Sequence, residues 1–400
     1  MGFMIQTPTQ ILFGRGMKDR AADAIAAFGP RGVLVHGANP ARADWLAQDL
    51  RAKDCTVATL PCTEEPTQPI LEAALVTARA FAPDWVVALG GGAVIDMGKA
   101  LAALIPSPTP LMDHLEVVGR GLPLTAAPLP FIALPTTAGT GAEVTKNAVI
   151  GLPDHRRKVS LRDDRMLARL AIVDPSLTDH CPWKVTFASG LDAVVQVIEP
   201  YLSTRANDFS DAIAHPAIVR GLTALQRLSQ AEESTARDEL AWVSLCGGLA
   251  LANAGLGAVH GLAGPIGGMC PAPHGAVCAV LLGPALEMNR RRADQNAQAT
   301  HRLGQVCTII AQALGGSAET APQTVATWVS RAGLEGLTAQ GLALAIFVHH
   351  FRGPIRRGNA VPHQLFGVKA DHLAKRRIHI GDATLAVTRA QARDQRVFHG

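Results

Sequence analysis

Residues Trp85–Lys99 read WVVALGGGAVIDMGK, and this stretch decides the class of fold. The short apolar run Trp85–Leu89 predicts a strand that is buried on both faces. Three glycines follow at once, Gly90–Gly92, and a helix-like segment comes next. Glycines between a strand and a helix let backbone N–H groups approach a phosphate, and the helix N-terminus adds a favourable dipole. The stretch therefore predicts a phosphate-binding turn, with an ordinary tight turn as the alternative, because Ile95 occupies the third glycine position of the usual dinucleotide fingerprint.

The same alternation of strand and helix extends over the first half of the chain. The other predicted strands are Gln10–Phe13, Gly32–His36, Thr56–Leu60, Phe131–Pro135 and Leu170–Val173. The predicted helices are Met17–Phe28, Arg42–Lys53 and Ile70–Phe81, and the predicted hairpin pairs Val144–Ile150 with Lys158–Arg162. Such alternation indicates a parallel sheet that is covered by helices on both faces. We expect an α/β dinucleotide-binding domain over residues 1–176.

A second candidate phosphate loop follows the predicted strand Phe131–Pro135. Residues 136–143 read TTAGTGAE, so hydroxyl groups and glycines gather where the strand ends. An ordinary polar loop fits this stretch equally well when it is taken alone. Two such loops after two buried strands of one sheet predict a dinucleotide crevice at the carboxyl ends of the strands. Lys158 is a candidate to reach into this crevice, and a surface lysine is the alternative.

The second half of the chain reads as almost entirely helical. The predicted helices are Val185–Tyr201, Asp208–Arg227, Arg237–Leu256, His274–Asn289, Gln295–Leu314 and Thr320–Ala332. Gly, Pro or Asn breaks the pattern between them. We expect an all-α domain over residues 177–400, in which the basic, weakly periodic segment 375–400 has no assigned role.

Four polar side chains in this half form a candidate metal site. Asp192 and Gln196 share one face of an apolar helix, where buried polar groups need partners. His260 and His274 flank a Gly- and Pro-rich segment, and a turn over residues 264–273 would bring His260, near the end of one helix, towards His274 at the start of the next. Oxygen and imidazole donors suit a divalent metal. The alternatives are hydrogen bonds between helices and core histidines bonded to backbone.

Composition excludes several classes of protein. The chain of 400 residues is 48% hydrophobic and 18% charged, with a net charge of only +4, so it is globular and does not call for nucleic acid or an anionic membrane. No apolar run is long enough to cross a membrane, and the N-terminus lacks the features of a signal peptide. The seven cysteines have no CxxC or framework spacing, so we expect a reduced, cytoplasmic protein.

Five stretches, taken together and in order, resemble the iron-containing (group III) alcohol dehydrogenases, including the maleylacetate reductase-like branch. They are Phe13–Gly16 (FGRG), Gly90–Lys99 (GGGAVIDMGK), Leu134–Thr145 (LPTTAGTGAEVT), Gly190–Tyr201 (GLDAVVQVIEPY) and Val259–Leu282. The resemblance implies the dehydroquinate synthase-like fold, in which an α/β nucleotide-binding domain precedes a helical domain and the cofactor lies between them beside Fe²⁺ or Zn²⁺. It also implies a homo-oligomer, often a dimer, that acts on a small alcohol or carbonyl substrate.

The resemblance implies a role for each candidate residue. The cofactor would be bound by Gly37, Arg42, Gly91, Gly92, Ala93, Thr136, Thr137, Thr140 and Lys158, with the pyrophosphate at Gly91, Gly92 and Ala93. Asp192, His260 and His274 would hold the metal and act in catalysis, and Gln196 would be a weak fourth ligand or an orienting group.

Three residues depart from the family pattern. The family has His where this chain has Gln196, and a neutral oxygen donor weakens the binding of Fe²⁺ or Zn²⁺. The family commonly has a second His at the position of Gly264, so a proton relay is missing and the pocket is wider. Many NAD-dependent members have Asp at the position of Gly37, where an acid would repel the 2′-phosphate of NADP. Because this chain lacks that acid and has Arg42 nearby, the sequence favours NADP over NAD.

We therefore predict a metal-dependent, NAD(P)-linked alcohol dehydrogenase or carbonyl reductase. One alternative is a metal-free reductase of the maleylacetate type. Another is a phosphate-substrate enzyme of the same fold, for which Arg352, Arg356 and Arg357 would bind the phosphate. A third is a non-catalytic nucleotide-binding protein.

Overall fold

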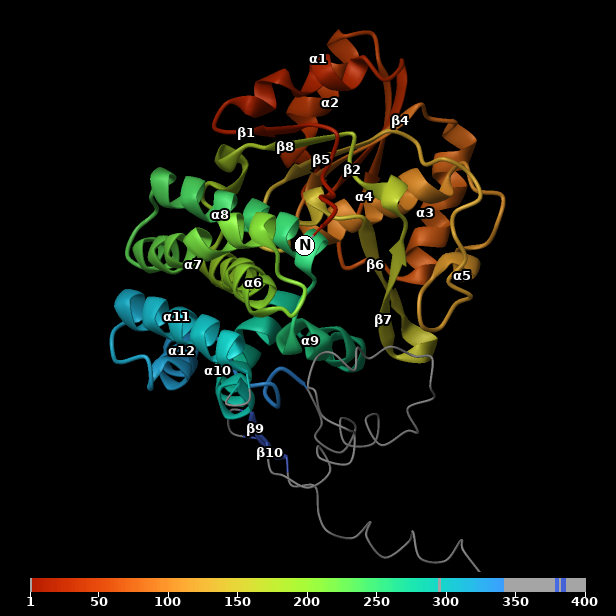
Figure 1. The fold of residues 1–400 in the computed structure, drawn as a ribbon. Helices are drawn as coiled ribbons and strands as arrows, with labels where there is room; N and C mark the ends of the chain where they lie inside the picture. The colour runs from red at the N-terminus through yellow and green to blue at the C-terminus, as the bar shows by residue number, and fades with distance from the viewer. Residues whose placement is uncertain (1, 294–295, 342–377, 381–382, 386–400) are drawn as a thin grey trace, which may run out of the picture.

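The computed structural model describes residues 2–293, 296–341, 378–380 and 383–385. An N-terminal α/β part lies beside a part built of long helices, which confirms the predicted fold class (Figure 1). The six strands of the main sheet are β1 (Ile11–Phe13), β2 (Arg31–His36), β3 (Thr56–Pro61), β4 (Trp85–Gly90), β5 (Phe131–Pro135) and β8 (Leu170–Val173). The helices of this part are α1 (Ala21–Ala26), α2 (Asp44–Ala52), α3 (Gln68–Phe81), α4 (Gly92–Leu104) and α5 (Leu111–His114).

The main sheet is parallel, and its strand order is β1-β8-β5-β4-β2-β3. After β2 the chain goes to β3 on one side and then returns to form β4 on the other side. The order therefore reverses between β2 and β4, which is where open α/β sheets bind their ligands. The glycines that follow these two strands, Gly37 and Gly91, lie at this point of the sheet.

Alternate residues of the strands bury opposite faces of the sheet. Val33, Val35 and Val86 pack with α3 and α4, whereas Leu34 and Val87 pack with α1 and α2. The continuous apolar runs of the sequence are thus explained by helices on both faces. Apolar burial of this kind is the main favourable contribution to folding.

Two residues fit α4 to its surroundings. A Cβ atom at Gly98 would lie 2.7 Å from the Cβ of Ala88, so only glycine allows this close approach of α4 to β4. Lys99 is 1% exposed, and its ammonium group donates to the carbonyl of Ala142 at 2.9 Å and to the hydroxyl of Thr145 at 3.0 Å. Burial lowers the pKa of Lys99, against the effect of Asp96 3.5 Å away. Lys99 therefore ties the loop after β5 to α4.

The predicted hairpin is present. Strands β6 (Asn147–Leu152) and β7 (Arg157–Arg162) pair antiparallel, with a 3-10 turn at Pro153–His155. The hairpin packs on α4 through β6 and on the helical part through β7.

The second part consists of long helices around α6. They are α6 (Trp183–Leu202), α7 (Asp208–Leu228), α8 (Ser234–Ala254), α9 (Ala258–Met269), α10 (His274–Ala293), α11 (Ala297–Leu314) and α12 (Ala321–Arg331). Helix α6 packs against α7, α8 and α10, and every residue of Gly190–Tyr201 is buried. The short strands β9 (Ile378–Ile380) and β10 (Ala383–Leu385) pair antiparallel.

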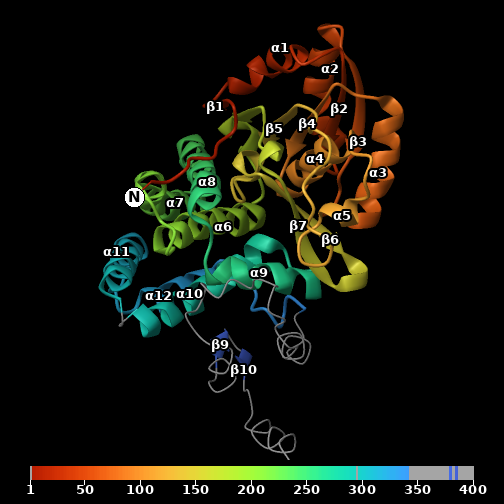
Figure 2. The same cartoon turned by 45° about the vertical axis from the view of Figure 1, so that its right-hand side comes forward.

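The turn predicted over residues 264–273 is wrong. Helix α9 continues through its glycines to Met269, and only residues 270–273 join it to α10. Ala263 and Ile266 bury one face of this helix, and Gly267 and Gly268 allow close contact with β7. His260 therefore lies in the first turn of α9 and not near a helix end, while His274 begins α10 as predicted. Helix α9 lies between α10 and β7 (Figures 1 and 2).

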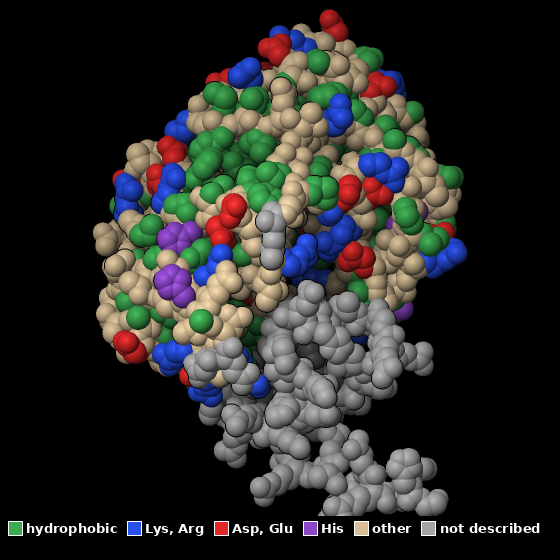
Figure 3. All heavy atoms as spheres, viewed as in Figure 1, with side chains coloured by type: hydrophobic (Ala, Val, Ile, Leu, Met, Phe, Trp, Pro, Cys, Tyr) green, Lys and Arg blue, Asp and Glu red, His purple; other side chains and the backbone are tan. Residues whose placement is uncertain are grey.

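The surface carries mixed charge. On the face that Figure 3 shows, Lys and Arg side chains are interspersed with Asp and Glu. No single helix in the described part of the chain is long and apolar enough to cross a membrane; α8 and α9 pass that test only as a pair, with a bend of 99° between them. The arginines considered for a phosphate substrate, Arg352, Arg356 and Arg357, lie outside the described residues, as does most of the segment 375–400.

Candidate functional site

Three acidic or amide side chains line one face of α6. Asp192, Gln196 and Glu199 follow at i, i+4 and i+7, and all are buried in the segment Gly190–Tyr201, whose other residues are apolar or glycine. Buried polar groups need partners, and these three point towards the starts of α9 and α10 and towards the loop after β5. The sequence prediction included the first two residues and missed Glu199, although its spacing places it on the same face.

Glu199 positions His260. Its carboxylate accepts a hydrogen bond from the backbone N–H of Val259 at 2.6 Å, at the positive N-terminus of α9. The other oxygen lies 2.7 Å from Nδ1 of His260. This contact directs Nε2 of His260 towards Asp192, whose Oδ1 is 3.2 Å away. A carboxylate on the far nitrogen of an imidazole is the usual support of a metal-binding histidine.

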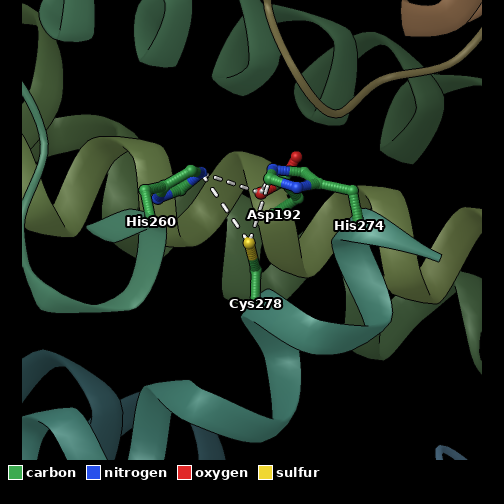
Figure 4. Close-up of side chains that lie close together, drawn as sticks. All are labelled: Asp192, His260, His274 and Cys278. Carbon is green, nitrogen blue, oxygen red and sulfur yellow. Dashed lines mark hydrogen bonds and ion pairs between the residues drawn. The ribbon is translucent and has the colours of Figure 1, made fainter. Parts of the chain in front are cut away.

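Helix α10 contributes two donors to the same point. His274 and Cys278 are four residues apart and share one face of the helix. Nε2 of His274 lies 3.7 Å from Oδ1 of Asp192, and Sγ of Cys278 lies 3.6 Å from Nε2 of His274 and 3.8 Å from Nε2 of His260. Figure 4 shows the two imidazoles turned towards Asp192, with the sulfur below them. The sequence prediction missed Cys278, although the spacing His274-x-x-x-Cys278 carried the signal.

The donor atoms of Asp192, His260, His274 and Cys278 all lie within 4.8 Å of one another. They come from three different helices, so only the folded chain brings them together. A carboxylate, two imidazoles and a thiol are donors that divalent transition metals accept. The residues present therefore fit a divalent metal.

The charges in this cluster stabilise one another. Burial raises the pKa of Asp192, but His274 and His260 outweigh burial and hold it below its ordinary value. The charge of Cys278 raises the pKa of His274 to about 9, and Asp192 adds to the effect against the cost of burial. Burial lowers the pKa of His260, but Cys278, Asp192 and Glu199 outweigh it and raise the pKa well above its ordinary value. The acidic groups thus create an environment that favours positive charge.

Gln196 joins the cluster to the loop after β5. Its amide nitrogen donates to the carbonyl of Gly139 at 3.0 Å and to Oδ2 of Asp192 at 3.3 Å. The carbonyl of Gly139 can only accept, which fixes the orientation of the amide. Gln196 therefore presents N–H, and not oxygen, to Asp192.

The two predicted phosphate loops lie side by side. Strands β4 and β5 are neighbours, and the N–H of Thr136 donates to the carbonyl of Gly90 at 3.0 Å. A Cβ atom at Gly91 would lie 3.3 Å from Oγ1 of Thr137, and one at Gly92 would lie 2.9 Å from Oγ1 of Thr140. Side chains at Gly91 and Gly92 would fill the space between the loops. The backbone at the start of α4, which includes Ala93, therefore fits a phosphate group.

The remaining cofactor candidates lie around these loops. Gly37 follows β2, and a Cβ atom there would lie 4.0 Å from Val94 of α4. Arg42 is exposed, and its guanidinium donates to the carbonyl of Leu177 at 3.3 Å. Lys158 of β7 forms an ion pair with Glu65.

Comparisons with known proteins agree with this arrangement. A sequence model described as iron-containing alcohol dehydrogenase matches residues 8–175, and one described as Fe-containing alcohol dehydrogenase family, C-terminal, matches residues 186–333. The probable alcohol dehydrogenase EutG of Salmonella typhimurium is 33% identical over 281 residues, which are 67% of this chain and 70% of that protein. Long-chain-alcohol dehydrogenase 1 of Geobacillus thermodenitrificans is 38% identical over 219 residues, so 54% of this chain matches 55% of that relative's length.

Solved structures agree as well. The iron-containing alcohol dehydrogenase from Thermococcus thioreducens superposes with a TM-score of 0.76 at 26% identity, covering 88% of this chain and 90% of that one. Sulfoacetaldehyde reductase from Bifidobacterium kashiwanohense, in complex with NAD⁺, gives a TM-score of 0.74 at 25% identity, covering 88% and 93%. The chain belongs to the iron-containing alcohol dehydrogenase family, whose members are nicotinamide-linked oxidoreductases that act on CH–OH groups.

Proposed function

We propose that this chain is a metal-dependent, NAD(P)-linked alcohol dehydrogenase or carbonyl reductase that acts on a small alcohol, aldehyde or ketone. The observation that carries the proposal is the convergence of Asp192, His260 and His274 on one point, directly beside the second phosphate loop. A hydride transfer between nicotinamide and a carbonyl carbon needs this combination of a dinucleotide crevice and a site for the carbonyl oxygen.

Asp192, His260 and His274 hold the metal in this proposal. A divalent metal bound there supplies a Lewis acid that polarises the substrate oxygen. Glu199 orients His260, and Gln196 orients Asp192 through its amide N–H, so Gln196 has the role of an orienting group. All of these residues lie on the helices α6, α9 and α10, whose packing against one another holds them in fixed positions for catalysis.

The cofactor lies along the edge of the sheet in this proposal. The pyrophosphate meets the backbone N–H groups of Gly91, Gly92 and Ala93 at the start of α4. The hydroxyl groups of the second loop and the ammonium group of the hairpin line the rest of the crevice; these are Thr136, Thr137, Thr140 and Lys158.

We further propose a preference for NADP over NAD. Gly37 has no carboxylate to repel a 2′-phosphate, and Arg42 is exposed in the 3-10 helix Pro40–Arg42 that follows. Arg42→Ala should then weaken the binding of NADPH more than the binding of NADH. Titration of both cofactors by fluorescence tests this preference, and equal losses for the two would contradict it.

Gly264 leaves the site without the second imidazole that the family commonly has. Among the described residues, no atom lies within 4 Å of a Cβ atom built at this position. The proton that accompanies hydride transfer then comes from water or from a ribose hydroxyl, and the substrate pocket is wide at this point.

Other parts of the assignment stay predictions. We keep residues 1–176 and 177–400 as the two domains, supported by family matches that end at 175 and resume at 186. Assembly as a homo-oligomer and a cytoplasmic location are likewise predictions.

A metal-free reductase of the maleylacetate type is the second candidate. The observation that favours it is Gln196, which replaces an imidazole and presents N–H to the cluster. Under this proposal the site would bind the substrate carbonyl through hydrogen bonds alone.

Elemental analysis of the purified protein beside Asp192→Ala distinguishes the two candidates. We expect about one equivalent of metal in the wild type and none in the variant, together with oxidation of NAD(P)H by aldehydes or ketones in the wild type only. If the wild type takes up no metal even when Fe²⁺ and Zn²⁺ are offered, and still turns over a carbonyl substrate, this would favour the metal-free reductase. The absence of any turnover across varied carbonyl compounds would contradict both.

A further inference from the structure

Cys278 is the donor in the cluster that neither the sequence prediction nor the family pattern accounts for. Its side chain is fully buried on α10, one turn after His274. A buried cysteine usually packs as a small apolar group. Here the sulfur instead lies within 3.8 Å of both site imidazoles and belongs to the group of four donors around one point.

Four of the six distances between donors of the cluster are close to those of one coordination geometry, and every pair of donors lies within 4.8 Å. Tetrahedral Zn²⁺, with bonds of about 2.1 Å to nitrogen or oxygen and about 2.3 Å to sulfur, sets nitrogen and sulfur ligands about 3.6 Å apart and nitrogen and oxygen ligands about 3.4 Å apart. The sulfur of Cys278 lies 3.6 and 3.8 Å from the two imidazole nitrogens, and Oδ1 of Asp192 lies 3.2 and 3.7 Å from them. A central ion would reach all four donors with small movements of side chains.

The neighbouring polar groups are not available as a fourth donor beside Asp192, His260 and His274. The amide of Gln196 donates to Gly139 and cannot offer its oxygen at the same place. Glu199 is occupied by His260 and by the N-terminus of α9. Without Cys278, the described donors at this point would be Asp192 and the two imidazoles alone.

We propose that Cys278 is the fourth protein ligand of the metal and that it makes the site select Zn²⁺ over Fe²⁺. This inference rests on the proposed metal-dependent function. A thiolate is a soft donor that favours Zn²⁺, and Zn²⁺ also lies above Fe²⁺ in the general order of affinity. The chain thus has a thiolate on α10 in place of the imidazole that the family pattern has on α6.

Loading with Co²⁺ tests the ligand directly, because a thiolate bound to cobalt absorbs in the near ultraviolet by charge transfer. We expect this band in the wild type at one Co²⁺ per chain. Cys278→Ala should abolish the band. It should also weaken metal binding by more than ~10–100-fold, which is the usual loss when a residue that only supports a metal ligand is replaced. Cys307→Ala is the matched control, since Cys307 is buried in α11 outside the cluster, and it should keep the wild-type spectrum.

Competition between Zn²⁺ and Fe²⁺, read by elemental analysis without oxygen, tests the selectivity. The wild type should take up Zn²⁺, and Cys278→Ala should lose most of this preference. Co²⁺ bound without the charge-transfer band would overturn the role of Cys278 and leave the metal-dependent function standing. No binding of Co²⁺, Zn²⁺ or Fe²⁺ by the wild type would overturn both. The wild-type spectrum can overturn the role of Cys278 by itself, even where the variant fails to fold.

Discussion

Glu199 orients His260 but is not one of the four donors of the cluster. Its carboxylate bonds Nδ1 of His260 and the backbone of Val259, so one acid fixes both the ring and the start of α9. Glu199→Gln should keep the shape but lose the charge, and we expect metal affinity to fall by ~10–100-fold. Competition with a chelator of known affinity measures this change.

Glu287→Gln is the control for this substitution, because Glu287 also lies on a site helix but pairs with Arg291 at the far end of α10. It should leave metal affinity unchanged. An unchanged affinity in Glu199→Gln as well would show that metal binding does not depend on the charge of this carboxylate.

A second single residue, Glu143, makes stability depend on pH. Its carboxyl is 3% exposed, and burial raises its pKa from 4.5 to about 7. Between these values the unfolded chain releases the proton while the folded chain keeps it, so stability is full below about pH 4.5 and falls as the pH rises to about 7. The difference amounts to on the order of 3 kcal/mol.

Glu143→Gln removes this titration. Relative to the wild type, the variant should gain free energy of unfolding as the pH rises from about 4.5 to about 7, and then stay level. Urea denaturation of both proteins at a series of pH values gives the difference curve. A difference that does not change with pH would contradict the assigned burial of this carboxyl.

At the scale of one element, α9 contains glycines with opposite roles. A Cβ atom at Gly268 would lie 2.6 Å from Cα of Arg157 in β7, whereas one at Gly264 would meet no atom of the described residues within 4 Å. Gly268→Ala should therefore destabilise the protein by about 1–3 kcal/mol through overpacking. Gly264→Ala should stabilise it by roughly 0.5–1 kcal/mol, because alanine has the higher helix propensity.

Thermal and urea denaturation of these two alanine variants decides the prediction, since each serves as the control for the other. Opposite signs are expected from the same chemical change in the same helix. Equal effects would mean that α9 does not approach β7 as closely as the structure has it.

At the scale of the whole molecule, the α/β part and the helical part meet at several places, one of which involves α8. Val144, Val173 and Leu245 form part of a small apolar cluster there, and a Cβ atom at Gly248 of α8 would lie 2.6 Å from Val144 and overlap the carbonyl of Gly141. Gly248→Ala should push α8 away from the second phosphate loop. We expect a loss of about 1–3 kcal/mol in stability together with weaker binding of the nicotinamide cofactor.

The control for this substitution is Gly304→Ala in α11, where a Cβ atom would meet nothing within 4 Å in the part of the chain that the structure describes. This control should not lose stability through overpacking, and its cofactor affinity should equal that of the wild type. Denaturation and cofactor titration of both variants provide the two measurements. Normal cofactor binding in Gly248→Ala would show that the loop does not depend on α8.

Local sequence patterns were sufficient for the sheet, for the hairpin and for the helices of the second part other than α9, because buried strands and helices have distinct periods. They failed for α9, because the reason for Gly268 is its contact with β7, which lies far away in the sequence. Glu199 and Cys278 had the right spacing on their helices, but spacing does not reveal a partner on another helix. The orientation of Gln196 depends in the same way on the carbonyl of Gly139.

That last hydrogen bond gives the molecule a thermodynamic link between two ligands. The amide of Gln196 holds Asp192 with one contact and the second phosphate loop with the other. A cofactor that stabilises the loop should therefore also stabilise Asp192, the proposed metal ligand, and the reverse should hold with the same factor, because coupling between two binding equilibria is reciprocal. Cofactor and metal should accordingly be heterotropic effectors of one another, with a single side chain carrying part of their interaction free energy.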